Sequence, residues 1–317
     1  MRAIRRRELL QLTAAGVLAA PLVAAASARQ PAPLKPGSRI AALAPGTWLE
    51  PGDPLLTRLK QRCTEQGWQL LTPPELMGQW RWFSGTDQQR EGALRKAWLD
   101  PSIDALFCVG AGWGSARVLE QGWTIPPQPR WCVGFSDCSA LLLAQQRAGS
   151  SGGIHAWFGG DQAQWQRLVA LLQDRPVPPL IGKGVQGGVV AGPLVVSNLT
   201  IATSLIGTPW MPSLEGAILV LEDTGEAPYR IDRQLTQWRA SGLLSRLAGI
   251  ALGRFRWAED EVLPGDFSMQ EILLERLQPL GLPMVSDLPV GHGTPNLALP
   301  LGRQAQLDGR SGRLALL

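Results

Sequence analysis

Short apolar runs alternate with amphipathic stretches from residue 37 to about residue 173. The apolar runs have the length and composition of buried strands, and the stretches between them carry apolar residues at helical spacing. Thr86, with Gln89 three residues later, is typical of a helix N-terminus. The predicted strands are 40–44, 68–71, 105–109 and 131–135, and the predicted helices are 55–66, 86–99, 115–120, 139–147 and 162–173. This alternation predicts a Rossmann-like α/β domain, with a mainly parallel sheet covered by helices on both faces.

A proline-rich run, Arg-Pro-Val-Pro-Pro at residues 175–179, interrupts the alternation. Prolines end the preceding helix and favour an extended connection between domains. Beyond them, the pattern predicts strands at 188–196, 217–221, 249–252 and 305–307, and helices at 231–240 and 269–277. We therefore expect an N-terminal domain over 37–175, a linker over 176–185, and a smaller, β-rich α/β domain over 186–317.

The first 28 residues have the features of an export signal. Three arginines at 5–7 precede an uncharged stretch at 12–28, which ends in the cleavage-like sequence Ala26-Ser27-Ala28. The order Arg-Arg-x-Leu-Leu at residues 6–10 fits a twin-arginine signal. We therefore predict export to the periplasm rather than a cytoplasmic location. An uncleaved membrane anchor is the alternative, although the run is marginal for spanning a bilayer.

The positive charge of the chain is concentrated in this predicted signal. The formal net charge is +4, and residues 1–28 contain four arginines and one glutamate, so the rest of the chain carries about +1. The basic character is therefore no argument for nucleic-acid binding. No second apolar run is long enough to cross a membrane, so we expect no stable membrane span after processing.

Cysteine and histidine usage gives no support for a metal site. The chain has two histidines and four cysteines, with no CxxC pair and no zinc-ligand spacing. Cys108 and Cys132 lie inside apolar strand-like runs, which favours buried free thiols. A disulfide remains open in an exported protein, but the sequence does not pair the cysteines.

A serine stands at a predicted strand-to-helix turn, in the segment Gly134-Phe135-Ser136-Asp137. A hydroxyl at such a turn is exposed at the edge of the sheet, and the next backbone N–H lies near a helix N-terminus, where negative charge is stabilised. Cys138 occupies the place of the second glycine of a G-x-S-x-G elbow. The residues alone leave Ser136 as either a capping serine or a nucleophile.

An acidic pair and a histidine occupy loop positions in the second half of the chain. Glu222 and Asp223 directly follow a predicted strand, and Arg230 lies shortly downstream. A solvated strand end with surface ion pairs is the simplest interpretation of these residues alone. His292 stands between two glycines, so it has no packing neighbours adjacent in sequence. That setting suits a functional position at least as well as a core position.

The segment Gly-Ala-Gly-Trp-Gly-Ser at 110–115 follows one predicted strand and precedes a helix. It differs from a dinucleotide-binding fingerprint because Ser115 stands at the third glycine position and no acidic residue closes a second strand at the expected distance. The glycines free backbone amides that can face an oxyanion instead. The segment therefore points away from nucleotide binding.

Taken in order, these segments resemble the LD-carboxypeptidase family, which also contains the microcin C immunity peptidases. The resemblance runs from about Gly37 to Gly302. It rests on residues 40–45, 84–87 with 100–101, 112–117, 134–137, 198–199, 207–209, 221–223 with 228–233, and 291–293 with 299–302. Each match is weak alone, but this many in the same order is a specific signal.

The resemblance implies a serine peptidase whose site lies in a cleft between the two domains. Ser136 would be the nucleophile, His292 the general base, and Glu222 the carboxylate that orients the histidine. No metal or organic cofactor is implied.

The resemblance also implies how the substrate is held. The backbone amides of Asp137 and Gly112 would bind the oxyanion, and we expect the side chains of Trp113 and Arg230 to contact the substrate. Members often carry Arg-Gly-Gly-Tyr-Gly where this chain has Gly-Ala-Gly-Trp-Gly at 110–114. The missing arginine at Gly110 makes substrate identity less secure than reaction type.

The implied reaction releases D-alanine from a murein tetrapeptide by hydrolysis of the bond between a meso-diamino acid and D-Ala. Two alternatives stay open. The same three residues would also serve a hydrolase of a peptide–nucleotide antibiotic or another small peptide. A non-catalytic protein that captures muropeptides between its domains would share the export signal and the two-domain plan. The sequence leaves a homodimer open.

Overall fold

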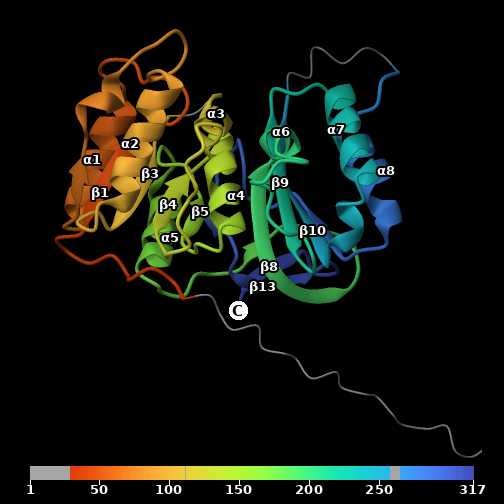
Figure 1. The fold of residues 1–317 in the computed structure, drawn as a ribbon. Helices are drawn as coiled ribbons and strands as arrows, with labels where there is room; N and C mark the ends of the chain where they lie inside the picture. The colour runs from red at the N-terminus through yellow and green to blue at the C-terminus, as the bar shows by residue number, and fades with distance from the viewer. Residues whose placement is uncertain (1–28, 111, 258–264) are drawn as a thin grey trace, which may run out of the picture.

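The computed structural model describes residues 29–110, 112–257 and 265–317, which form two α/β domains side by side (Figure 1). The predicted export signal, residues 1–28, lies outside the described residues. Within the described part of the chain, every helix falls short of the length and apolar character needed to cross a bilayer.

The N-terminal domain is built on a six-stranded sheet with the order β12-β5-β4-β3-β1-β2. Five strands run parallel, and the sixth, β12, pairs antiparallel with β5. Their bounds are β1 (Arg39–Leu43), β2 (Gln69–Leu71), β3 (Ala105–Cys108), β4 (Trp131–Gly134), β5 (Gly153–His155) and β12 (Leu299–Pro300). Every residue of β3 and β4 is buried, as expected for central strands covered on both faces. The predicted parallel α/β sheet is confirmed.

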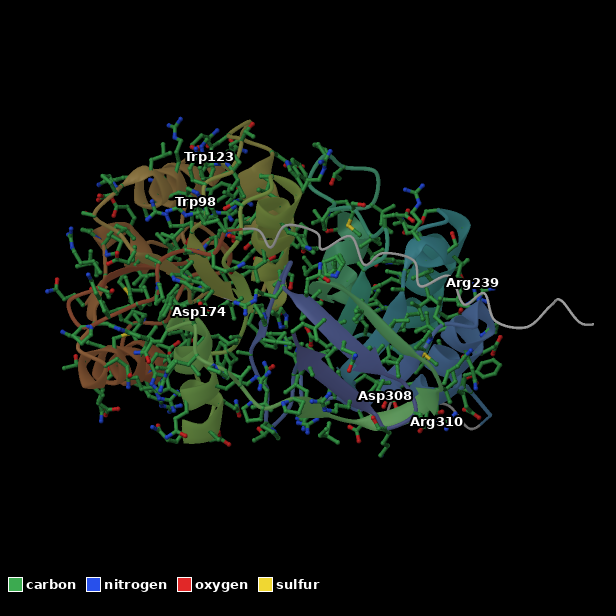
Figure 2. The ribbon with its side chains drawn as sticks, turned by 90° about the horizontal axis from the view of Figure 1, so that it is seen from below. Trp98, Trp123, Asp174, Arg239, Asp308 and Arg310 are labelled. Carbon is green, nitrogen blue, oxygen red and sulfur yellow. The ribbon has the colours of Figure 1, made fainter. Side chains whose placement is uncertain are left out.

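Five α-helices and two short 3₁₀ helices follow the strands of this domain, and one of the latter, η2 (Ser136–Cys138), lies directly before α4. The others are α1 (Pro54–Glu65), η1 (Pro74–Met77), α2 (Asp87–Leu99), α3 (Ser115–Leu119), α4 (Ser139–Arg147) and α5 (Gln162–Leu172). Helix α2 begins with the predicted capping box, in which Thr86 and Gln89 bond each other's backbone N–H groups. At its other end, Trp98 packs edge to face on Trp123, with ring centroids 5.9 Å apart (Figure 2). These contacts fix both ends of α2.

The C-terminal domain is an eight-stranded mixed sheet with the order β6-β14-β13-β8-β9-β10-β11-β7. Strands β8 to β11 are parallel, and the strands outside them pair antiparallel. Their bounds are β6 (Leu180–Ile181), β7 (Lys183–Gln186), β8 (Val189–Asn198), β9 (Ile218–Thr224), β10 (Gly249–Arg256), β11 (Met284–Ser286), β13 (Gln304–Asp308) and β14 (Arg313–Leu316). Only Gly182 separates the two edge strands, β6 and β7, so the sheet must curl until its edges approach each other.

Helices of the C-terminal domain pack on one side of this curled sheet (Figure 1). They are α6 (Leu199–Ser204), α7 (Pro228–Ala240) and α8 (Met269–Leu277), with 3₁₀ turns η3 (Leu244–Arg246) and η5 (Gln278–Leu280). The expected linker, 176–185, contains β6 and most of β7, so this segment contributes strands to the second sheet.

Helix α4 lies between the two sheets and joins the domains (Figure 1). Residues 139–145 are all buried, which is the pattern of a helix enclosed on every side. Its first residue, Ser139, accepts a hydrogen bond from the backbone N–H of Asn198 in β8, at 3.2 Å. One hydrophobic cluster extends from this helix into both domains. Because the Ser136 turn leads directly into α4, the candidate nucleophile lies at the domain junction.

Replacing the fully buried Leu141 of α4 by alanine is expected to lower the free energy of unfolding by about 2–5 kcal/mol, because the change leaves a cavity in the shared core. Leu99→Ala is the matched control, since Leu99 is 56% exposed and should stay within about 0.5 kcal/mol. Urea unfolding of both variants measures the difference. Equal unfolding midpoints would show that α4 does not hold the domains together.

Candidate active site

Ser136 occupies a strained turn at the carboxyl end of β4. It begins the 3₁₀ turn η2 (Ser136–Cys138) with φ of +56°, a left-handed conformation that is uncommon for a residue with a side chain. A Cβ atom at position 134 would lie 2.6 Å from the Cβ of Cys138, so only glycine allows the chain to turn this tightly. The structure therefore forms a nucleophile-type elbow although Cys138 replaces its second glycine.

The side chain of Asp137 connects this elbow to the glycine-rich segment 110–115. It is fully buried, and it accepts hydrogen bonds from the backbone N–H groups of Gly114 (3.2 Å) and Ser115 (2.9 Å) and from the Ser115 hydroxyl (2.7 Å). Burial raises the pKa of Asp137, and the bonds from Ser115 and Gly114 oppose that rise. The sequence singled out only the backbone amide of Asp137, whereas its carboxylate fixes the position of the neighbouring turn.

Two glycines of the segment 110–115 lie too close to Thr47 to carry side chains. A Cβ at Gly112, where φ is +94°, would be 2.2 Å from the Thr47 hydroxyl oxygen. A Cβ at Gly110 would be 2.6 Å from the Thr47 carbonyl oxygen. At position 110, this packing leaves no room for the arginine that the family resemblance suggested.

Arg90 holds the same segment by a hydrogen bond to its backbone, although the sequence had not marked it as a site residue. Its side chain is buried, donates to the carbonyl of Gly114 at 2.8 Å, and also donates to the carbonyl of Pro45. Its guanidinium lies 4.4 Å from the ring centre of Phe83. Burial lowers the pKa of Arg90, and Asp87 partly offsets this by hydrogen bonding to it.

Glu222 and His292, 70 residues apart in sequence, form a direct hydrogen-bonded pair. Glu222 Oε2 lies 2.7 Å from His292 Nδ1 and accepts a second bond from the His292 backbone N–H at 3.1 Å. The Glu222 side chain is 1% exposed and that of His292 is 23% exposed. A carboxylate only accepts hydrogen bonds, so it favours the tautomer with the proton on Nδ1 and leaves Nε2 free to accept a proton.

The backbone around Gly291 makes this pair possible. Gly291 has φ of +103°, and a Cβ there would lie 2.5 Å from the Cβ of Glu222. The N–H of Gly291 donates to the side chain of Asn296 at 3.0 Å, and Gly291 forms an isolated parallel β-bridge with Arg254 of β10. Only glycine lets the loop pass this close to β9.

Phe135, the residue before Ser136, packs against the ring of His292. Its ring centre is 4.4 Å from that of His292, and Ser136 is the next residue along the chain. The Ser136 turn, from the N-terminal domain, therefore lies near the Glu222–His292 pair of the C-terminal segment. A nucleophile, a base and a buried carboxylate in this arrangement can perform acyl transfer.

A second histidine, His155, lies beside the other oxygen of the Glu222 carboxylate. It ends β5, is fully buried, and its Nε2 is 3.9 Å from Glu222 Oε1. The ring of Phe135 meets it edge to face at 5.1 Å. The sequence analysis assigned no role to His155, since nothing in a strand-end histidine indicates a partner 67 residues away.

The expected substrate contacts lie on exposed surface of both domains. Trp113 is 40% exposed. The next residue, Gly114, lies so close to the ring of Phe83 that it has no room for a side chain. Trp82, 55% exposed, has its ring centre 5.3 Å from that of Phe83. Arg230, in the first turn of α7, pairs with Glu226 at 3.7 Å.

The described residues contain no cluster of three histidine, cysteine or acidic side chains that could hold a metal ion. The four cysteines are buried free thiols in the structure, and burial raises the pKa of Cys63 to about 12.

Removing the Asp137 carboxylate should both destabilise the protein and slow reaction at Ser136. Asp137→Ala leaves three donors buried without an acceptor, with an expected loss of at least about 2 kcal/mol in the free energy of unfolding. Asp308→Ala is a matched control, because Asp308 accepts the same set of three bonds, from Arg310 and Ser311, near the surface (Figure 2). Chemical denaturation that gave equal losses for the two variants would refute the special role of Asp137.

The stability of the protein should fall as the pH drops from about 6.5 to about 4 because of His155. Burial lowers the pKa of His155 to about 4 from its usual 6.5, with Glu222 opposing and His292 adding to the shift. The unfolded chain therefore takes up a proton in this range that the folded chain does not, which costs about 3 kcal/mol in total. In His155→Gln this part of the pH dependence should vanish, as followed by urea unfolding at each pH. Parallel curves for the two proteins would contradict the assignment.

Comparison with known proteins identifies the family of this chain. Residues 40–156 match the LD-carboxypeptidase N-terminal domain, and residues 191–307 match the LD-carboxypeptidase C-terminal domain. A candidate carboxypeptidase of Synechocystis is 42% identical over 294 residues, which cover 91% of this chain and 97% of that protein. The murein tetrapeptide carboxypeptidase of Pseudomonas aeruginosa is 32% identical over 252 residues, which cover 73% of this chain and 80% of that enzyme.

A solved structure shows the same architecture. The muramoyltetrapeptide carboxypeptidase of Oxalobacter formigenes superposes with a TM-score of 0.77 at 25% identity, covering 88% of this chain and 98% of that one. Both domain matches, the shared two-domain fold and the long alignments lead to one conclusion: this chain belongs to the LD-carboxypeptidase family of serine peptidases.

Proposed function

We propose that this protein is an exported LD-carboxypeptidase that removes the terminal D-alanine from murein tetrapeptides, with Ser136 as nucleophile, His292 as general base and Glu222 as the residue that orients His292. The observation that carries the proposal is the 2.7 Å contact between Glu222 and His292 beside the strained Ser136 turn. The names of the Pseudomonas and Oxalobacter relatives support the murein peptide as substrate.

The first chemical step joins Ser136 Oγ to the carbonyl carbon before the terminal residue. His292 takes the hydroxyl proton as the bond forms, and it later gives that proton to the leaving amine. The Glu222 carboxylate stabilises the imidazolium that exists between these two transfers. After D-alanine leaves, water attacks the acyl-enzyme. His292 takes a proton from this water and gives it to Ser136 Oγ, which frees the serine and the shortened peptide.

The backbone amides of Asp137 and Gly112 are the proposed oxyanion donors. The Asp137 amide lies at the start of a 3₁₀ turn that leads into α4, where negative charge is favoured. The positive φ of Gly112 and its packing on Thr47 fix the orientation of the second amide before substrate arrives. Preorganised donors of this kind stabilise the tetrahedral intermediate.

Specificity and location complete the proposal. Trp113 supplies an exposed indole beside the elbow, and Arg230 supplies a cation in the first turn of α7, the helix that follows the Glu222 strand. A cation there suits the free carboxylate or the diamino-acid carboxylate of the peptide. The twin-arginine sequence at residues 6–10 supports action in the periplasm, on wall peptides before their uptake.

Mass spectrometry of the mature enzyme with L-Ala-γ-D-Glu-meso-diaminopimelate-D-Ala tests this function. Wild type should release one D-alanine, and Ser136→Ala should be slower by roughly 10⁴–10⁶-fold with an unchanged fold. Ser102→Ala, a change at an exposed serine, is the control and should match wild type.

Near-normal turnover by Ser136→Ala would refute Ser136 as the nucleophile. An untouched tetrapeptide, with a wild-type serine that still reacts with a fluorophosphonate probe, would move the substrate to another small peptide. Failure of both reactions would favour a protein that binds muropeptides without cleaving them.

A further inference from the structure

The Glu222 carboxylate lies between two imidazoles, and only one of its oxygens is hydrogen-bonded. Oε2 holds His292, whereas Oε1 is buried and has no hydrogen-bond partner among the described residues. Both ring nitrogens of the fully buried His155 also lack partners among those residues, and Nε2 lies 3.9 Å from Oε1. An unsatisfied acceptor and an unsatisfied donor therefore face each other across a gap slightly longer than a hydrogen bond.

The surroundings of His155 leave little freedom for its ring. Its backbone pairs with Gly134 of β4 on one side and with Leu299 of β12 on the other. Phe135 packs against the ring edge to face, and the same Phe135 ring contacts His292 at 4.4 Å. His155 is thus held by the strand that ends in the nucleophile turn.

We propose that His155 is a positioning residue, whose Nε2–H donates to Glu222 Oε1 in the reacting enzyme and fixes the carboxylate that orients His292. This inference rests on the proposed function of Ser136, Glu222 and His292. Hydrogen bonds of catalytic groups are often long in the free enzyme and tighten when substrate binds. A small approach of β5 and β9, or a rotation of the carboxylate, would complete the bond.

His155 suits this role because it stays neutral while His292 carries the proton. Burial lowers the pKa of His155 to about 4, and the titratable groups facing it are Glu222, which opposes the shift, and His292, which adds to it. A neutral imidazole donates one hydrogen bond without neutralising the carboxylate. A charged lysine or arginine at this place would compete with the imidazolium of His292 for the same negative charge.

The bond would also join the two domains at the catalytic centre. His155 belongs to the N-terminal sheet and Glu222 to the C-terminal sheet, so the carboxylate is held from both sides. The orientation of His292 would then depend on the relative position of the domains.

His155→Gln and His155→Met form a matched pair for the test, because both have unbranched side chains of similar length and only Gln carries a donor. The rate at which a fluorophosphonate probe labels Ser136 is measured for wild type and both variants, because this reaction needs an activated serine but no particular peptide. Turnover of the murein tetrapeptide is measured in parallel, together with the thermal midpoint of each protein.

We expect Met to lower the labelling rate and kcat by roughly 10–100-fold, as when a group that orients a catalytic ligand is lost, with KM nearly unchanged. Gln should restore the rates to within about threefold of wild type. Equal rates in Gln and Met, at equal thermal midpoints, would overturn the role of His155 and leave the proposed function standing.

Two further outcomes separate this inference from the proposed function. Labelling of wild type without tetrapeptide cleavage would remove the proposed substrate, while the comparison of Gln with Met still decides the role of His155. A wild-type Ser136 that does not react with the probe would overturn both.

Discussion

The burial of the Glu222 carboxylate is the constraint on which the rest of this site depends. A charged group removed from water must be paired and hydrogen-bonded, or it destabilises the fold. Here one oxygen accepts hydrogen bonds from the ring and the backbone of His292, and the ring of His155 lies 3.9 Å from the other oxygen. His292 in turn packs on Phe135, the residue before Ser136, so the carboxylate–histidine pair and the serine turn meet at the domain junction.

The close approaches around this centre require backbone conformations that few residues adopt. Gly291 passes so close to Glu222 that a side chain at position 291 would overlap it. Gly112 passes similarly close to Thr47. Ser136 takes a left-handed conformation without being glycine. Such strain persists only where the surroundings over-determine it. The hydrogen bonds of Asp137 and the buried helix α4, which follow the serine along the chain, supply that support.

Local patterns were sufficient to predict most of the elements. The capping box at Thr86 was predicted from four residues, and the helix 269–277 coincides with α8, because short-range hydrogen bonding and spacing determine them. Long-range pairings were not predictable in this way. The two-residue strand β12 has no pattern of its own, yet it crosses to the N-terminal sheet and pairs with β5 at His155.

The candidate site divides in the same manner. Ser136, Glu222 and His292 follow apolar runs or stand between glycines, so their positions stand out in the sequence. The structure pairs Glu222 with His292 and packs His292 on Phe135, the residue before Ser136. Asp137 and Arg90 support the site through contacts with the segment 110–115, which no spacing in the sequence reveals. His155 was missed for the same reason, because its partner is defined only by the packing of one domain on the other.

The chain contains only two histidines, so one measurement tests the central claim that Glu222 fixes the tautomer of His292. The measurement is nitrogen NMR of a protein with ¹⁵N-labelled histidine and no histidine tag, with His155→Gln used to assign the signals. At neutral pH we predict that His292 carries its proton on Nδ1, and that Glu222→Gln changes this signal. A proton on Nε2 of His292, or a signal unaffected by Glu222→Gln, would contradict the account.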